Sequence, residues 1–267
     1  MQVFEELAEQ IERQLRVQTH PLAVRVLREG EEIPAGAERP VSDLGACHST
    51  CQCMAMSRRQ GRTIAQLKED MWCPEPAIGF GIGEAPSLFD EGHNRYPKDV
   101  ASIEAGAAWA TEEFPRFEPG RYSGIVSAPM ATALFEPDVL IIYCDTAQLT
   151  LLLLAAAWRD GSDVLSTISS HSSCVYSVVP VMQGVDFQVT VPCMGDRVRA
   201  LAGDDEMILS VRPEAAGDLL AGLRQLEATG RQIPFARGGS AEYQLPEPYG
   251  KIAREMGMTR GDGSAIE

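Results

Sequence analysis

The sequence is poor in positive charge, in aromatic side chains and in long apolar runs. It has 23 lysines and arginines against 38 aspartates and glutamates, for a net charge of −15. A field of that sign repels phosphate backbones, so nucleic acid is excluded as an expected partner. The longest apolar run, residues 149–158, is about half the length needed to cross a bilayer. The N-terminal residues 1–15 carry acids and have no signal-peptide core. We therefore expect a cytoplasmic protein without a membrane partner.

Two common catalytic signatures are incomplete or missing. Gly79, Gly81 and Gly83 resemble part of a phosphate-binding loop. They follow no clear strand, and the full fingerprint is lacking. A Ser-His-Asp order and a nucleophile elbow are both missing from the sequence. The sequence therefore gives no basis for assigning nucleotide binding or serine-hydrolase chemistry.

The chain is long and apolar enough to bury a real core, with 45% apolar residues among 267. Expected strands alternate with expected helices, which predicts an α/β or α+β fold with a mixed sheet flanked by helices. No linker interrupts the chain, so residues 1–267 are expected to form a single compact domain. The expected strands are 22–27, 122–130, 138–144, 164–168, 187–193 and 207–213, and the expected helices are 4–17, 63–70, 98–114, 147–159, 174–182 and 213–228.

A weak internal echo relates the two halves of the chain. In each half an apolar strand is followed by a cysteine, a Gln-Gly pair and a second cysteine. The pairs are Gln60-Gly61 and Gln183-Gly184. The echo is weaker than that of a true repeat array, and it predicts an internal duplication of the fold.

The chain contains seven cysteines, an odd number that argues against complete pairing in disulfides. The cytosol also keeps thiols reduced, which leaves metal binding or thiol chemistry. Thiolates suit iron–sulfur clusters or zinc. The cysteines form an N-terminal group and a C-terminal pair, with Cys144 between them: Cys47, Cys51, Cys53 and Cys73, then Cys174 and Cys193.

The spacing of these cysteines matches neither a ferredoxin nor a zinc ribbon. On a helix, Cys47 and Cys51 would share one face and Cys53 would point elsewhere. Free cysteines often simply pack in cores, and we expect this of Cys144 at the end of a strand. Cys73 and Cys193 lie beside prolines at the edges of expected elements, where ligands tend to lie.

Three segments in order resemble the uncharacterised prokaryotic family known as domain of unknown function 169. They are CQCMAMSRRQG from Cys51, CPEPAIGFG from Cys73, and the stretch from Cys174 through Cys193 to CMGDR. The resemblance covers residues 20–215 and leaves 216–267 as a C-terminal helical extension. It implies that Cys51, Cys73, Cys174 and Cys193 are the shared cysteine positions. Cys47, Cys53 and Cys144 depart from the family pattern, so Cys47 and Cys53 both stay open as alternatives to Cys51 or as additional ligands, of one cluster or a larger one.

Other polar residues flank the cysteines. His48 and His171 are candidates for proton transfer beside a cofactor, because imidazole titrates near neutrality. Arg197 is a candidate for holding a carboxylate. Each could equally be an ordinary surface or salt-bridged side chain.

Together these features predict an iron–sulfur protein whose Cys-ligated [4Fe–4S] cluster performs Lewis-acid or reductive chemistry on a small organic substrate. A lyase, a hydratase and a reductase are the reaction classes considered, and a role in anaerobic metabolism is expected. One alternative is a non-catalytic electron or cluster carrier that docks to a redox partner protein. Another is a structural zinc module. A homo-oligomeric assembly is compatible with each of these three functions.

Overall fold

A computed structural model describes residues 2–233 and 247–258 of the chain. By their contacts, the residues divide into two units, Met1–Ile233 and Pro234–Glu267. The described part of the second unit contains one helix, α11 (Glu247–Glu255). The rest of the predicted extension divides between α10, which lies in the first unit, and residues outside the described ranges. None of the described helices is long and apolar enough to cross a membrane.

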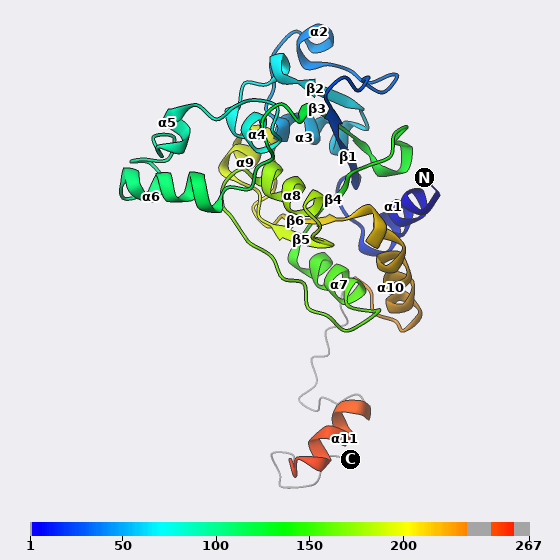
Figure 1. Cartoon of the computed structure of the whole chain (residues 1–267). Coiled ribbons are helices and arrows are strands. Elements are labelled where there is room, and N and C mark those ends of the chain that lie inside the picture. The colour runs from blue at the N-terminus through cyan, green and yellow to red at the C-terminus, as the bar shows by residue number, and fades with distance from the viewer. Residues whose placement is uncertain (1, 234–246, 259–267) are drawn as a thin grey trace. The chain divides into compact units, whose positions relative to one another are not determined.

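The first unit is built on one sheet with helices on both of its faces (Figure 1). Its described strands are β1 (Leu22–Arg28), β2 (Ile64–Leu67), β3 (Tyr122–Pro129), β4 (Val139–Cys144), β5 (Phe187–Thr190) and β6 (Met207–Val211). Its described α-helices are α1 (Gln2–Leu15), α2 (Pro40–Leu44), α3 (Thr50–Gln60), α4 (Pro74–Gly79), α5 (Ser87–Asp90), α6 (Ile103–Ala108), α7 (Thr146–Ala156), α8 (Ser173–Met182), α9 (Met194–Ala200) and α10 (Ala216–Ala228). Short 3₁₀ segments are η1 (Lys68–Asp70), η3 (Met130–Thr132) and η4 (Pro213–Ala215), and the π-helical turn η2 is Trp109–Glu113.

The predicted class, a sheet flanked by helices, is confirmed, but the sheet is antiparallel rather than mixed. Its strand order is β2-β3-β1-β4-β6-β5. Each pair of neighbouring strands in this sheet is antiparallel. The fold therefore corresponds to the α+β alternative. The strands joined through α3 (β1 and β2) and through α8 (β4 and β5) do run in the same direction, but β3 or β6 lies between them and pairs antiparallel with both. Helix–strand alternation alone therefore could not establish a parallel pairing.

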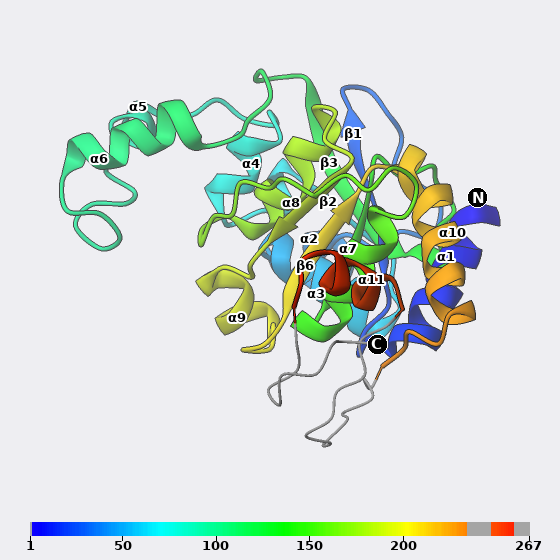
Figure 2. The same ribbon diagram turned by 90° about the horizontal axis from the view of Figure 1, so that it is seen from below.

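Strand β4 shows how the sequence assigns the two faces of the sheet. Side chains alternate along a strand, and all six residues of β4 are buried. Val139, Ile141 and Tyr143 pack into a core with α3, α4 and α8. Leu140, Ile142 and Cys144 pack into a second core with α1, α7 and α10. Because helices cover both faces of the sheet, β4 needs an apolar residue at each position (Figure 2).

Two predicted elements were wrong. Residues 63–70, expected as a capped helix, form β2 and η1 instead. The segment Ile64–Leu67 pairs with β3, and this tertiary pairing outweighs its local helix preference. Residues 164–168, expected as a strand, have no regular structure. They run beside β5 through side-chain bonds, in which the Val189 amide donates to Ser166 Oγ at 2.8 Å.

A third element, the helix expected at 98–114, is shorter and irregular. It begins at Ile103, where the Ser102 hydroxyl accepts a hydrogen bond from the Ala105 amide at 3.2 Å. It then continues into the π-helical turn η2. The residues before Ile103 form turns, and they supply part of the site described below.

The two halves of the first unit repeat one topology, which supports the predicted duplication. Apart from helices that occur in one half only, each half runs strand, helix, strand, helix, strand: β1-α3-β2-α4-β3, then β4-α8-β5-α9-β6. In the sheet the halves read β2-β3-β1 and β5-β6-β4, and they meet at the antiparallel pair β1 and β4. The short α2 and the segment with α5 and α6 are found in the first half alone, and α7 is found in the second half alone. In both views α5 and α6 project from the sheet.

The close contact between α7 and α10 gives a test of the second core. A Cβ atom added to Gly222 would lie 2.2 Å from the Ala155 carbonyl oxygen, whereas one added to Gly217 in the same helix would meet nothing within 4 Å. We expect Gly222→Ala to lower the free energy of unfolding by about 1–3 kcal/mol through overpacking. Gly217→Ala should leave it unchanged or raise it by up to about 1 kcal/mol. Urea denaturation of both variants measures the difference, and equal effects would contradict the packing described here.

Candidate metal centre

Four cysteines lie at the beginnings of helices. Cys51 is in the first turn of α3 and Cys174 in the first turn of α8. Cys73 and Cys193 immediately precede α4 and α9. The starts of α3 and α4 follow from local sequence: Ser49 caps α3 in a reciprocal box with Gln52, and Pro74 is the first residue of α4.

These four cysteines line one cavity of about 420 Å³, which we call the cysteine pocket. They come from positions as far apart as 51 and 193, and the repeated topology brings them together in pairs. Cys51 and Cys174 occupy equivalent positions in the two halves, as do Cys73 and Cys193. A pocket at the junction of the halves thus receives two sulfurs from each.

A longer sequence signal underlies this symmetry. His48-Ser49-Thr50-Cys51 corresponds to His171-Ser172-Ser173-Cys174, and a Gln-Gly pair begins nine residues after each cysteine. The Gln-Gly echo alone predicted a duplication, whereas the full repeated motif also identifies Cys51 and Cys174 as equivalent. Sequence reasoning missed that extension.

The sulfurs of the pocket interact with one another. Hydrogen bonds to the sulfurs of Cys174 and Cys193, together with burial, raise the pKa of Cys51 well above its ordinary value. The hydrogen bond with Cys51 and further bonds from Ser173 lower the pKa of Cys193 to about 4, against the opposing effect of burial. Burial raises the pKa of Cys73 to about 12, and the nearby sulfurs of Cys174 and Cys193 add to this. These shifts favour the thiolate form of Cys193 and the protonated forms of Cys51 and Cys73.

A buried polar network lies behind Cys193. Ser173 Oγ is 3.3 Å from both Cys193 Sγ and Asp196 Oδ2, so its single proton can serve either acceptor. The Tyr143 hydroxyl donates to Asp196 Oδ2 at 2.9 Å. Burial raises the pKa of Asp196 to about 6, and its Oδ1 has no hydrogen-bond partner among the described residues. The segment CMGDR contained Asp196, but the sequence did not indicate this contact.

The guanidinium of Arg58 extends this network to the other side of Tyr143. It lies 3.8 Å from the centre of the Tyr143 ring and is fully buried. It donates to both carboxylate oxygens of Glu206, at 2.7 and 3.0 Å. The polar groups behind Cys193 thus form a continuous chain that ends in a buried ion pair.

The other three cysteines lie elsewhere. Cys144 is in the core between the sheet and α7, as predicted for a packing cysteine, and burial raises its pKa to about 12. Cys53 is buried on α3 outside the pocket lining, and burial likewise raises its pKa to about 12. Cys47 is exposed and does not line the pocket.

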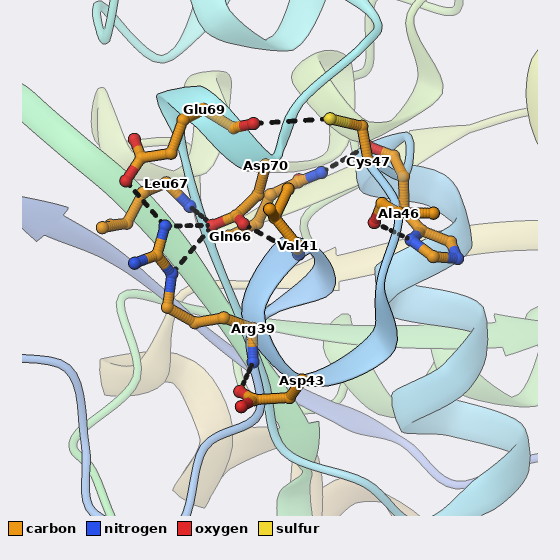
Figure 3. Close-up of polar contacts among 10 residues, drawn as sticks. Arg39, Val41, Asp43, Ala46, Cys47, Gln66, Leu67, Glu69 and Asp70 are labelled. Atoms are coloured by element: carbon orange, nitrogen blue, oxygen red, sulfur yellow. Dashed lines mark hydrogen bonds and ion pairs between the residues drawn. The ribbon is translucent and has the colours of Figure 1, made fainter.

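Cys47 and His48 belong to a hydrogen-bonded loop around Asp70 (Figure 3). The Cys47 thiol lies 3.4 Å from the Glu69 carbonyl oxygen, and His48 Nδ1 lies 2.9 Å from the Ala46 carbonyl oxygen. The fully buried Asp70 accepts bonds from Arg39 and from two backbone amides. The structure therefore places Cys47 and His48 in this loop and not in the pocket lining.

The remaining predicted residues divide between two places. His171 lines the cysteine pocket, and its Nε2 is 3.4 Å from an Asp99 carboxylate oxygen. Arg197 donates to the carbonyl of Gly203 and does not line the pocket. Arg199, two residues further along α9, does line it, and so does Lys98. Neither Arg199 nor Lys98 was singled out from the sequence.

The ligand groups are not arranged as a finished site for one ion. Among residues 2–233 and 247–258, no three or more histidine, cysteine, aspartate or glutamate side chains could hold a metal ion as they stand. A cluster differs from a single ion because each of its irons takes its own thiolate. For a cluster, the four sulfurs therefore need to surround a space that holds several irons, and they do not need to converge on one ion.

The fold and the pocket define an α+β protein with a four-cysteine pocket at the junction of two similar halves. The chain belongs to the family described as uncharacterised ArCR, domain of unknown function 169, whose model matches residues 10–222. This confirms the resemblance on which the four cysteines were chosen. Comparison with the curated proteins and with the solved structures gave no match.

The acidity of the Cys193 thiol can be tested by alkylation of the reduced, metal-free protein at pH 6. Cys193 should be almost wholly thiolate, whereas about a millionth of Cys73 should be ionised. A low pKa also lowers nucleophilicity, by three to four powers of ten over this range, so we expect Cys193 to react about a hundredfold faster. Mass spectrometry after an iodoacetamide pulse measures the ratio. Cys73 is the more exposed of the two, so faster labelling of Cys73 would show that exposure governs reactivity.

Proposed function

We propose that Cys51, Cys73, Cys174 and Cys193 hold an iron–sulfur cluster of the [4Fe–4S] type, and that the protein is an enzyme that uses this cluster on a small organic substrate. The observation that carries the proposal is that four sulfurs from two distant regions of the sequence line one cavity. Thiolates are the ligands that such clusters require. Lewis-acid and reductive chemistry both remain open as reaction classes.

The surroundings of the sulfurs support an anionic cofactor. Cys51 and Cys174 lie in the first turns of α3 and α8, where unpaired backbone amides and the helix dipole favour negative charge. Ser173 and the Asp196 amide donate hydrogen bonds to the Cys193 sulfur. Donors of this kind tune the potential of a bound cluster.

The pocket also supports the enzyme over a purely structural site. It is lined by His171, Lys98 and Arg199 in addition to the cysteines, so polar groups that could contact a substrate share the cavity with the sulfurs. His171 is the remaining candidate for proton transfer. Its predicted counterpart His48 lies outside the lining.

A second candidate function is an electron or cluster carrier that docks to a redox partner protein. The observation that favours it is the apolar face of α9 beside Cys193. Met194, Val198 and Leu201 recur there at helical spacing, and each is about 70% exposed. A cluster that is reduced and reoxidised without turnover of any offered substrate would support the carrier.

The proposal is tested by anaerobic purification followed by iron, sulfide and zinc analysis of the same sample. We expect about four irons and about four sulfides per chain, with broad visible absorbance. One zinc per chain with a colourless protein would instead support a structural zinc module. A cytoplasmic location belongs to the same proposal, since cytosolic thiols remain reduced.

A further inference from the structure

The cysteine pocket contains two cations that form no ion pair with a carboxylate of the described residues. Its carboxylates have partners: Glu75 accepts a hydrogen bond from Ser172, and Asp99 faces both His171 and Arg95. Its two permanent cations, Lys98 and Arg199, have no carboxylate within 4 Å among the described residues. Two unpaired cations in one cavity are unexpected in a chain with a net charge of −15.

The two cations come from parts of the fold that do not obey the internal repeat. Lys98 lies in the insertion between α5 and α6, which the second half lacks. Arg199 lies on α9, whose counterpart α4 ends at Gly79 without a basic residue. The repeated elements therefore supply the four cysteines, and the elements that differ between the halves supply the two cations.

Apolar surface adjoins this charge. The Arg199 guanidinium lies 4.4 Å from the centre of the Trp72 ring, which is partly exposed. Stacking of this kind holds the guanidinium plane and leaves its edge N–H groups free to bind an acceptor. Trp72, Phe89, Pro74 and Met194 line the same cavity as the two cations.

We infer that the cysteine pocket binds a small organic acid, with its carboxylate between Lys98 and Arg199 and its apolar body against Trp72 and Phe89. The inference names the substrate class for the proposed cluster enzyme and so rests on that proposal. It also replaces Arg197 with Arg199 as the residue that holds the anion. A competing explanation is that both cations only balance the charge of the cluster, and the experiment separates the two.

The experiment is calorimetric titration of the full-length protein, purified anaerobically, with a panel of carboxylates at constant ionic strength. The panel runs from acetate through phenylacetate to benzoate, with succinate as a dicarboxylate and with benzamide and inorganic phosphate as controls. We expect an aromatic carboxylate to bind more tightly than acetate, and benzoate more tightly than benzamide. Phosphate binding as tight as that of the best carboxylate would overturn the assigned class.

Matched variants locate the binding. Lys98→Gln and Arg199→Gln should each weaken carboxylate binding by about tenfold to a hundredfold, the effect of losing one charged hydrogen-bond donor. Lys68→Gln and Arg121→Gln remove the same charges elsewhere. Lys68 lines a second cavity, which also includes Cys73, and Arg121 also stacks on aromatic rings. Both controls should bind as the wild type does.

Iron analysis of every sample separates the two proposals. Wild-type protein that contains iron but binds no member of the panel overturns the inference alone. Loss of iron from Lys98→Gln or Arg199→Gln shows that the cations serve the cluster, and this also overturns it. Wild-type protein that lacks iron contradicts the proposed function, whatever the titration shows.

Discussion

Replacing Cys73 or Cys193 with serine should remove the visible chromophore and most of the iron. Each supplies one of the four sulfurs of the pocket, and the two lie in equivalent positions of the two halves. A serine hydroxyl is a poor substitute for a soft thiolate. We expect iron to fall from about four to below about one per chain. Inductively coupled plasma analysis and absorbance of anaerobically purified protein measure the loss.

Two other cysteines provide matched controls for this result. Cys144→Ser should retain full colour, because Cys144 packs on the opposite face of the sheet. The pair Cys51→Ala and Cys53→Ala is a sharper comparison, since both residues are buried on α3 and only Cys51 lines the pocket. Full colour in Cys73→Ser or Cys193→Ser would contradict the ligand assignment. Equal loss in Cys51→Ala and Cys53→Ala would point to disruption of α3 instead.

Arg58→Met should destabilise the protein strongly. It leaves the carboxylate of Glu206, which is largely buried, without the two hydrogen bonds that it accepts from Arg58, so that only the Gly203 amide still donates to it. It also removes the cation from above the Tyr143 ring. Removing one partner of a buried ion pair costs about 3–5 kcal/mol. Guanidinium denaturation measures the change. Arg62→Met, which breaks the more exposed pair with Glu38, should cost less than about 1 kcal/mol.

The same pair predicts how this difference depends on pH. Burial raises the pKa of Glu206, but the hydrogen bonds and charge of Arg58 outweigh it, and the pKa lies below its ordinary value of 4.5. A lowered carboxyl pKa contributes stability above that ordinary value, and this stability is lost as the pH falls through the folded-state pKa. The gap between wild type and Arg58→Met should therefore be full at neutral pH and shrink below about pH 4. A gap that is constant down to pH 3 would show that the ionised carboxylate is not its source.

The family resemblance selected four cysteines that the structure brings to one cavity, and the sequence predicted a sheet flanked by helices. The apolar run of β4 and the amphipathic α1 require burial in any packing. The sequence was insufficient where pairing with a distant segment of the chain determines the local secondary structure. Residues 63–70 have a helix-like composition, yet β3 offers Ile64–Leu67 an edge with which to pair. An antiparallel sheet likewise could not be distinguished from a mixed one by the alternation of helices and strands.

The choice between Arg197 and Arg199 shows a second limit. The two residues lie on the same short helix, two positions apart, and therefore point in different directions. Only the rotation of α9 about its axis decides which guanidinium reaches the pocket, and seven residues carry too little periodicity to predict it. Lys98 was missed because it lies in turns that were expected to be helical. Contacts such as Ser173–Asp196 depend on the packing of α8 against α9 and have no local signal.

The internal repeat of the first unit bears on how the fold arose. A half-length precursor with two cysteines could have gathered four sulfurs by pairing with a second copy of itself, because β1 and β4 meet as antiparallel equivalents. Such a symmetric dimer could offer only a cavity with two identical sides. Fusion of the two copies into one polypeptide would release each side to diverge. In the present chain the first half carries the insertion with Lys98 and the second half carries Arg199, so the two sides of the pocket differ although each supplies two sulfurs.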